Sequence, residues 1–240
     1  MTKSPILRWT LLSTLAVTLC HTSFVAAADD VKPADGNQVP LKFVIPKALF
    51  VGTPKNIKAS ATLEPYSEKP QAPLMIPGGC TNLAAKKNVT SSDSAPIIGE
   101  LSLATDGDKD GADGSFVELA PGKQWIQIDL ENPADVSAIV VWHYHAEGRV
   151  YHSVVAQISD DPEFIKGVKT VFNNDFADAL GFGAGKQLEY IDDYRGKALA
   201  VKDAQGNPVR GRYVRLHSNG NTSNDQNHYV EVEVYGKLVK

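Results

Sequence analysis

Cysteine is scarce in this sequence of 240 residues, which contains only two. Cys20 lies in an apolar N-terminal stretch that we expect to be removed on export, so Cys80 would be the only remaining thiol and no internal disulfide could form. A chain without disulfides depends on its hydrophobic core and on any ion that it binds. About 210 residues would remain, which is ample for one large domain with an appended segment.

Long hydrophobic runs are missing beyond the N-terminus. Lys3 and Arg8 accompany an apolar run over residues 9–19, and small residues follow at 26–28. This order predicts a signal peptide over residues 1–28. Because no later run approaches the length of a membrane helix, we expect a secreted protein, periplasmic or extracellular, with no membrane insertion.

Basic residues are outnumbered as well. Removal of residues 1–28 leaves 22 lysines and arginines against 28 acidic residues, a net charge of about −6. Nucleic acids and anionic lipids bind basic surfaces, so this balance argues against both as main partners. An uncharged ligand such as a glycan fits the charge better.

Helix signals are few, and prolines dominate residues 29–80. Eight prolines recur there, at positions 33, 40, 46, 54, 65, 70, 73 and 77. They exclude long helices and central strands, so we interpret residues 29–80 as an extended Pro-rich linker or wrapping segment. Its apolar stretches 41–45 and 48–51 could lie against a domain surface. Nothing in the segment indicates a separate folded domain.

From residue 81 onwards, short apolar runs alternate with Gly, Asn, Asp and Pro, which is typical of a β-sandwich or barrel. Ile126, Ile128 and Leu130 share one face, which predicts a half-buried strand over residues 125–130. Residues 136–145 are nearly all apolar, as in a strand covered on both faces. Further strands are predicted at 154–159, 212–217 and 228–235. We therefore expect one all-β domain over residues 81–240.

The acidic loop, residues 106–114, concentrates carboxylates and glycines. Its aspartates are Asp106, Asp108, Asp110 and Asp113. Glycines allow sharp bends, so several oxygens could face one hard cation such as calcium. A solvated acidic turn is the alternative interpretation. An EF-hand is not expected, because Val117 stands where a bidentate glutamate is required.

The segment 142–152 concentrates histidine, arginine and aromatic residues. Its candidate ligand-binding residues are His143, His145, Arg149, Tyr151 and His152. Sugar recognition uses an aromatic face for the C–H patch of a pyranose and polar groups for its hydroxyls, and this segment offers both. The alternative is that these side chains are core or strand residues bonded to their neighbours.

A second candidate ligand-binding region is the loop over residues 218–228. It carries five asparagine or glutamine amides, more directed hydrogen-bonding groups than a turn needs. We predict that Asn219, Asn224 and Asn227 contact a ligand. A merely solvated loop is the alternative.

Six segments occur in an order known from one protein family. They are residues 82–92, 104–107, 125–130, 155–161, 211–216 and 231–236. Together they make the chain resemble the discoidin domains, also called coagulation factor V and VIII type C domains, and related bacterial carbohydrate-binding modules of the galactose-binding-like fold. The resemblance implies an antiparallel β-sandwich jelly roll with ligands held by loops at one end.

The same resemblance implies a structural calcium ion. In many relatives it is held by the aspartate of an Ala-x-Asp-Gly segment, by nearby carbonyls and aspartates, and by the glutamate that opens the last strand. Carried onto this sequence, these side chains are Asp106, Asp108 and Glu231, with Asp110 or Asp113 as further ligands. The loop is longer and more acidic here than the usual family pattern.

The pair His143-x-His145 also permits a catalytic interpretation. Alternate strand histidines can bind zinc, copper or iron with a third ligand from His152, His228 or Glu147. The spacing departs from that of the cupin jelly rolls. The sequence also lacks a nucleophile elbow and a His-Glu-x-x-His motif.

We therefore predict a secreted, non-catalytic binding module for carbohydrate or a cell-surface polymer, with a structural calcium site. One alternative is a metal-dependent jelly-roll enzyme built on the two histidines. Another is an adhesion domain whose partner is a protein. Elemental analysis separates them, since stoichiometric zinc, copper or iron would favour the enzyme and calcium alone the module.

Overall fold

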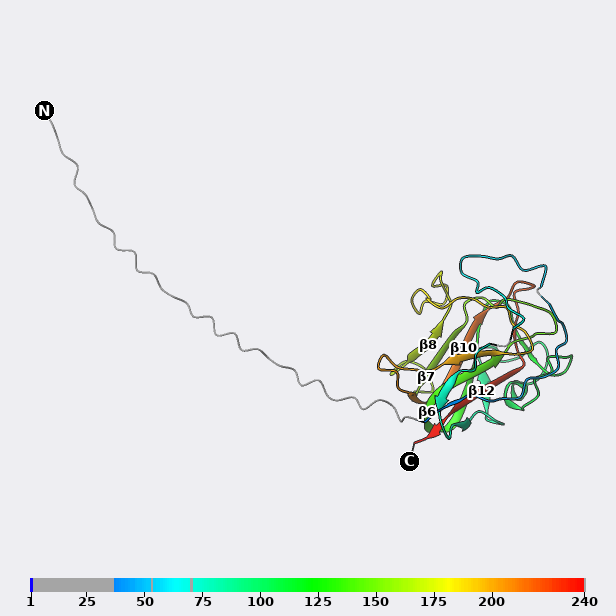
Figure 1. Cartoon of the computed structure of the whole chain (residues 1–240), viewed down its shortest axis with the longest axis horizontal. Coiled ribbons are helices and arrows are strands. Elements are labelled where there is room, and N and C mark those ends of the chain that lie inside the picture. Colours follow the sequence, from blue (N-terminus) through cyan, green and yellow to red (C-terminus); the bar gives the residue numbers. More distant parts are fainter. Residues whose placement is uncertain (2–36, 53, 70, 240) are drawn as a thin grey trace. The chain divides into compact units, whose positions relative to one another are not determined.

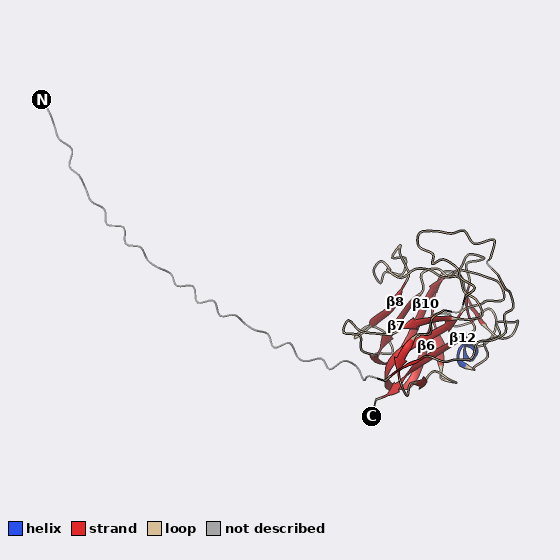
Figure 2. Cartoon of the chain, viewed as in Figure 1, coloured by secondary structure: helices blue, strands red, loops and turns tan. Residues whose placement is uncertain are grey.

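The computed structural model describes residue 1 and residues 37–52, 54–69 and 71–239 (Figure 1). Apart from Met1, the predicted signal peptide lies outside the described residues. From residue 37 the described chain consists of strands and loops with one short 3-10 helix, η1 (Leu101–Thr105) (Figure 2). In this part of the chain no helix is long and apolar enough to cross a membrane. The predicted all-β class is confirmed.

The described residues contain twelve strands, and every pairing between them is antiparallel. In chain order they are β1 (Gln38–Pro40), β2 (Met75–Pro77), β3 (Thr81–Asn82), β4 (Val89–Ser91), β5 (Val117–Leu119), β6 (Lys123–Trp142), β7 (Val155–Ser159), β8 (Lys169–Asn173), β9 (Lys197–Ala200), β10 (Val209–Asn219), β11 (Asn227–Tyr229) and β12 (Glu231–Leu238).

The long strand β6 connects the two halves of the sandwich. Its first half pairs with β4 and β10, and its second half pairs with β12 and β9. The halves meet at Glu131, whose backbone φ is 66°, just before Pro133. The sequence predicted two separate strands here, and that prediction is wrong. The turn-forming residues bend the chain without ending the strand, because hydrogen bonding to β10 resumes beyond them.

Alternate residues in the second half of β6 enter two different apolar clusters. Ile139 and Val141 belong to the main core, together with Ile128 from the first half. Val140 and Trp142 belong to a second cluster on the other face. All five side chains have no exposed surface, so the predicted strand covered on both faces is confirmed.

The Pro-rich segment lies against the second of these clusters. Its strands β1 and β2 pair with each other, and Leu41 and Ile76 are buried beside Trp142. Phe43 meets the Trp142 ring edge-on, with 5.4 Å between ring centroids. The apolar contacts of this segment are therefore concentrated at its two ends.

Candidate functional site

A buried polar cluster lies where β6 ends and the chain turns back toward β7. The His143 ring has no exposed surface and stacks on Tyr151, with 4.3 Å between ring centroids. Its Nδ1 donates to Asp192 Oδ1 at 2.9 Å. Asp192 reaches this place because its amide donates to the Arg149 carbonyl at 2.8 Å, an isolated bridge between distant segments. No local sequence signal marks Asp192, since its contact with His143 joins residues 49 positions apart.

A hydrogen-bonded chain extends from the cluster to β5. The Tyr151 hydroxyl lies 2.9 Å from His228 Nδ1, and His228 Nε2 lies 3.1 Å from Glu118 Oε2. Burial, with the nearby Arg149 charge, lowers the pKa of His228 to about 3. The imidazole is therefore neutral near pH 7, and its contact with Glu118 is a hydrogen bond rather than an ion pair. Burial also raises the pKa of Glu118.

Arg149 contacts both an aromatic ring and a carboxylate. Its guanidinium carbon lies 4.3 Å from the centre of the Tyr144 ring, and Nη2 donates to Glu147 Oε1 at 2.6 Å. The residue is only 8% exposed, and neither Nε nor Nη1 has a hydrogen-bonding partner. A buried guanidinium with two unused donors is costly unless a further group accepts from them.

His145 does not share the surroundings of His143. Its Nε2 donates to the Lys109 carbonyl at 2.8 Å, and Gly111 packs so closely that an added Cβ would lie 2.8 Å from Nε2. The ring therefore supports the acidic loop. Among the described residues, no three His, Cys, Asp or Glu side chains are grouped so that they could hold a metal ion. The alternative of a transition-metal site on His143 and His145 is not supported.

The asparagine-rich loop is organised largely by its own amides. Asn227 has no exposed surface, donates to the Ala120 and Gly122 carbonyls, and accepts from the Gly220 amide. Asn224 is exposed and bonds Asn221. All three hydrogen bonds of the Asn227 side chain are made to backbone groups of the domain, so the structure supports a structural role for Asn227 instead of the predicted ligand contact.

The two remaining predicted ligand residues lie at the edge of the same region. Asn219 is half-buried at the end of β10, and its amide donates to the His152 carbonyl at 2.8 Å. The His152 ring is partly exposed and lies 3.0 Å from Glu189 Oε1. The structure thus brings His143, Arg149 and Tyr151 together, and leaves Asn219, Asn224 and His152 around them.

Glu231 connects the last strand to the acidic loop. It has no exposed surface, and its Oε2 accepts from the Gly107 amide at 3.1 Å while Oε1 has no partner. Burial, together with the charges of Glu233 and Asp106, raises the pKa of Glu231 to about 8, although the Gly107 amide and Lys109 act in the opposite direction. A carboxyl in this position needs either a proton or a nearby cation.

The other aspartates of the acidic loop do not converge on Glu231. Asp108 accepts from the Asp110 amide through Oδ1 and from the Ser115 hydroxyl through Oδ2. Asp110 and Asp113 are exposed. These contacts stabilise turns of the loop. Among the aspartates of the loop, Asp106 is the one whose charge raises the pKa of Glu231.

Comparison with known proteins identifies the family. The model of the F5/8 type C domain matches residues 88–232, which is more than half of the chain. The protein therefore belongs to the F5/8 type C domain family, and the resemblance to discoidin domains is confirmed. No curated protein shows a significant match.

Solved structures with a similar arrangement include domains of larger proteins. A family 89 glycoside hydrolase from Clostridium perfringens is 19% identical, with a TM-score of 0.49, and the match covers 66% of this chain and 15% of that one. A chitosan-binding module from a Paenibacillus sp. IK-5 chitosanase/glucanase is 25% identical over 65% of this chain and 98% of that one, with a TM-score of 0.44. A fucolectin from striped bass (Morone saxatilis) serum is 20% identical over 66% and 50%, with a TM-score of 0.45.

Proposed function

We propose that the protein is an exported, non-catalytic domain that binds a neutral carbohydrate, either a free glycan or a cell-surface polymer. Two observations support this: its membership of the F5/8 type C family and the polar cluster beyond the end of β6. The acidic composition favours an uncharged ligand over nucleic acid or anionic lipid.

The observation that carries the proposal is a concentration of unpartnered polar atoms. Of eight buried side-chain N and O atoms without a hydrogen-bonding partner among the described residues, five belong to His143, Arg149, Tyr190 and Asp192. The two Arg149 nitrogens donate, whereas His143 Nε2 and Asp192 Oδ2 accept when the imidazole is neutral and the carboxyl ionised. A sugar hydroxyl both donates and accepts, so a mixed set of this kind suits sugar hydroxyls better than an anion or a cation.

Isothermal titration against galactose, N-acetylglucosamine, fucose and their oligomers tests the proposal. Replacing Arg149 by methionine keeps much of the side-chain volume and removes the donors. A hydrogen bond to a charged group contributes roughly 1.5–3 kcal/mol, so the affinity should fall roughly 10- to 100-fold. Arg210→Met, which removes an exposed ion pair with Asp135, is the matched control and should bind normally. Absence of binding across the panel would refute the proposal and leave a protein partner as the alternative.

We also propose that calcium binds beside Glu231. The unpartnered Oε1, the raised pKa and the proximity of Asp106 support a cation at this position. Because no three acidic or histidine side chains are grouped there among the described residues, backbone carbonyls of the acidic loop would supply the other ligands. The ion would neutralise a buried carboxylate and tie the loop to β12, which begins at Glu231.

A further inference from the structure

A long loop separates the paired strands β1 and β2. The strands hold its ends together, and the Leu41 amide donates to the Leu74 carbonyl at 2.7 Å beyond the last strand pair. The described residues between these two positions form no strand. Loops of this length inside a compact domain are uncommon and often serve as lids over binding sites.

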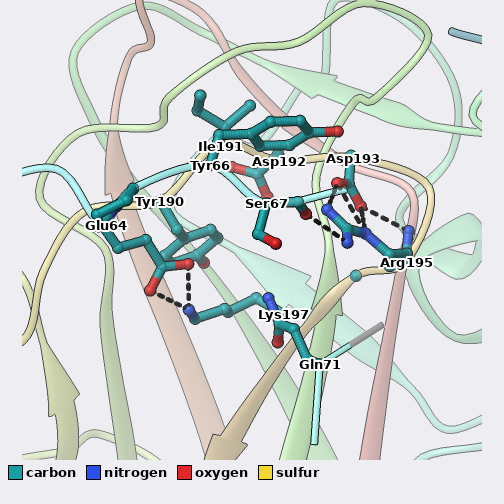
Figure 3. Close-up of a pocket in the computed structure, with 12 residues that line it drawn as sticks. Glu64, Tyr66, Ser67, Gln71, Tyr190, Ile191, Asp192, Asp193, Arg195 and Lys197 are labelled. Atoms are coloured by element: carbon teal, nitrogen blue, oxygen red, sulfur yellow. Dashed lines mark hydrogen bonds and ion pairs between the residues drawn. The ribbon is translucent and has the colours of Figure 1, made fainter. Parts of the chain in front are cut away.

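Residues 54–69, which we call the covering loop, lie over the polar cluster. Figure 3 shows Glu64, Tyr66 and Ser67 facing the segment from Tyr190 to Lys197. These residues line a small cavity of about 40 Å³. These loop residues precede the family match, which begins at residue 88. The cavity is therefore partly walled by a segment outside the matched domain.

The covering loop also touches the turn that carries Arg149. An added Cβ at Gly148 would lie 2.2 Å from Pro54 Cγ, and Phe50 lies close by. Asp192 lines the cavity and bonds His143 beneath it. The unpartnered atoms of His143, Arg149, Tyr190 and Asp192 have almost no accessible surface, so no ligand can reach them in this arrangement.

The contacts that hold the covering loop are mostly polar. Lys197 Nζ lies 2.7 Å from both Glu64 carboxylate oxygens, and Arg195 donates to the carbonyls of Ser67 and Lys69. Glu189 exchanges backbone hydrogen bonds of 2.8 and 2.9 Å with the loop at residues 62 and 64.

None of residues 54–69 is buried, in contrast to Leu41 and Ile76 at the ends of the long loop. Segments with few buried apolar contacts and exposed hydrogen bonds open at low free energy. Leu41 and Ile76 can therefore stay in place while the covering loop moves.

We propose that the covering loop is a lid, and that a carbohydrate ligand reaches Arg149 and Asp192 only after the lid opens. This rests on the proposed function for the site. The lid explains why the cluster is sealed from solvent and still keeps donors and acceptors without partners. The closed lid excludes solvent but does not supply the hydrogen bonds that a ligand would make to these atoms.

A disulfide lock tests the lid in a single protein. Leu63 and Glu189 are paired in an isolated parallel bridge, so Leu63→Cys with Glu189→Cys should be able to form a cross-link. Binding of the panel sugar that the unmodified protein binds most tightly should fall at least tenfold on oxidation and return on reduction. The reduced form is the matched control, since both forms carry the same substitutions. Equal affinity of the two forms would overturn the proposal.

Hydrogen exchange tests the lid without any ligand. The amides of Glu64 and Glu189 are bonded across the lid contact and should exchange well before the amides of β6. Glu64→Gln, which removes a partly exposed ion pair with Lys197, should accelerate their exchange roughly two- to fivefold, whereas Asp135→Asn should not. Exchange only through global unfolding would refute the lid. Local opening in a protein that binds no sugar would uphold the motion and refute the carbohydrate proposal.

Discussion

Two buried carboxylates in this domain, Glu231 and Asp192, each keep one oxygen without a hydrogen-bonding partner. Burial raises the pKa of both. Their surroundings differ. Glu231 has the carboxylates of Glu233 and Asp106 nearby, whereas Asp192 is hydrogen-bonded to the His143 imidazole.

The difference bears on the two proposed ligands. Around Glu231, acidic groups outnumber the single nearby lysine, which favours the cation that we propose there. Around Asp192, donors and acceptors without partners are mixed, which favours the neutral, hydroxyl-bearing ligand that we propose there. Two carboxylates that are buried to a similar degree therefore suit different ligands.

Calcium should produce the largest stability effect in this comparison. An ion at 100 times its dissociation constant stabilises the folded state by about 2.7 kcal/mol, which for a domain of this size raises Tm by roughly 5–10 °C. Thermal melts with calcium and with excess chelator measure the change. The shift should vanish in Glu231→Gln.

Two controls show whether the effect belongs to Glu231. Glu131→Gln changes an exposed glutamate of β6 and should keep the full calcium response. Asp192→Asn should keep it too, because the ion is proposed beside Glu231 and not at Asp192. A melting curve that ignores chelator would refute the calcium site, and a response lost in Asp192→Asn would break the distinction between the two carboxylates.

Acid should destabilise the domain through His228. Its pKa is about 3 when folded against an ordinary value of 6.5, so the unfolded chain binds this proton first as pH falls. The contribution of the neutral His228 imidazole to the free energy of unfolding is complete above pH 6.5. It is lost as the pH falls toward 3, at no more than about 1.4 kcal/mol per pH unit. Urea unfolding at pH 7 and pH 4.5 measures the loss.

The variant His228→Asn isolates this proton. It should show a smaller difference in unfolding free energy between pH 7 and pH 4.5 than the unmodified protein, although it is less stable at pH 7. His152→Asn, at a partly exposed histidine, is the control and should keep the original difference. Equal pH dependence in both variants would show that burial beside Arg149 does not keep the His228 imidazole neutral in the folded domain.

Much of the fold could be predicted because it follows from local alternation. Ile126, Ile128 and Leu130 all point into one core, as their spacing requires. The continuity of β6 could not be predicted, because Glu131 and Pro133 are turn-forming residues whose role here depends on β10. Hydrogen bonding to the distant strand β10 makes Glu131 and Pro133 a bend within one strand rather than a turn between two strands.

The candidate site was predictable only in part for the same reason. Aromatic, histidine and arginine side chains within residues 142–152 marked the region, and His143, Arg149 and Tyr151 do meet there. Asp192 was missed because its partner His143 lies 49 positions away in the sequence. Tyr190 was missed because nothing in the sequence shows that its hydroxyl is buried without a hydrogen-bonding partner. The lid was missed because proline spacing indicates an extended chain without showing what the chain covers.

Two buried tyrosines, Tyr151 and Tyr190, differ in the hydrogen bonding of their hydroxyl groups. Tyr151 donates to or accepts from His228, whereas the Tyr190 hydroxyl has no partner, although both rings are almost fully buried. Tyr151→Phe leaves a buried imidazole nitrogen unpaired and should lower the free energy of unfolding by about 1–3 kcal/mol.

Tyr190→Phe removes a hydroxyl that makes no hydrogen bond, so stability should change by no more than about 0.5 kcal/mol or increase. If the Tyr190 hydroxyl serves the ligand, the same variant should lose several-fold in sugar affinity while its unfolding curve stays in place. Urea unfolding and isothermal titration on one preparation measure both quantities. A large loss of stability with unchanged affinity would mean that the Tyr190 hydroxyl has a structural partner, as the Tyr151 hydroxyl has in His228, and that Tyr190 does not serve the ligand.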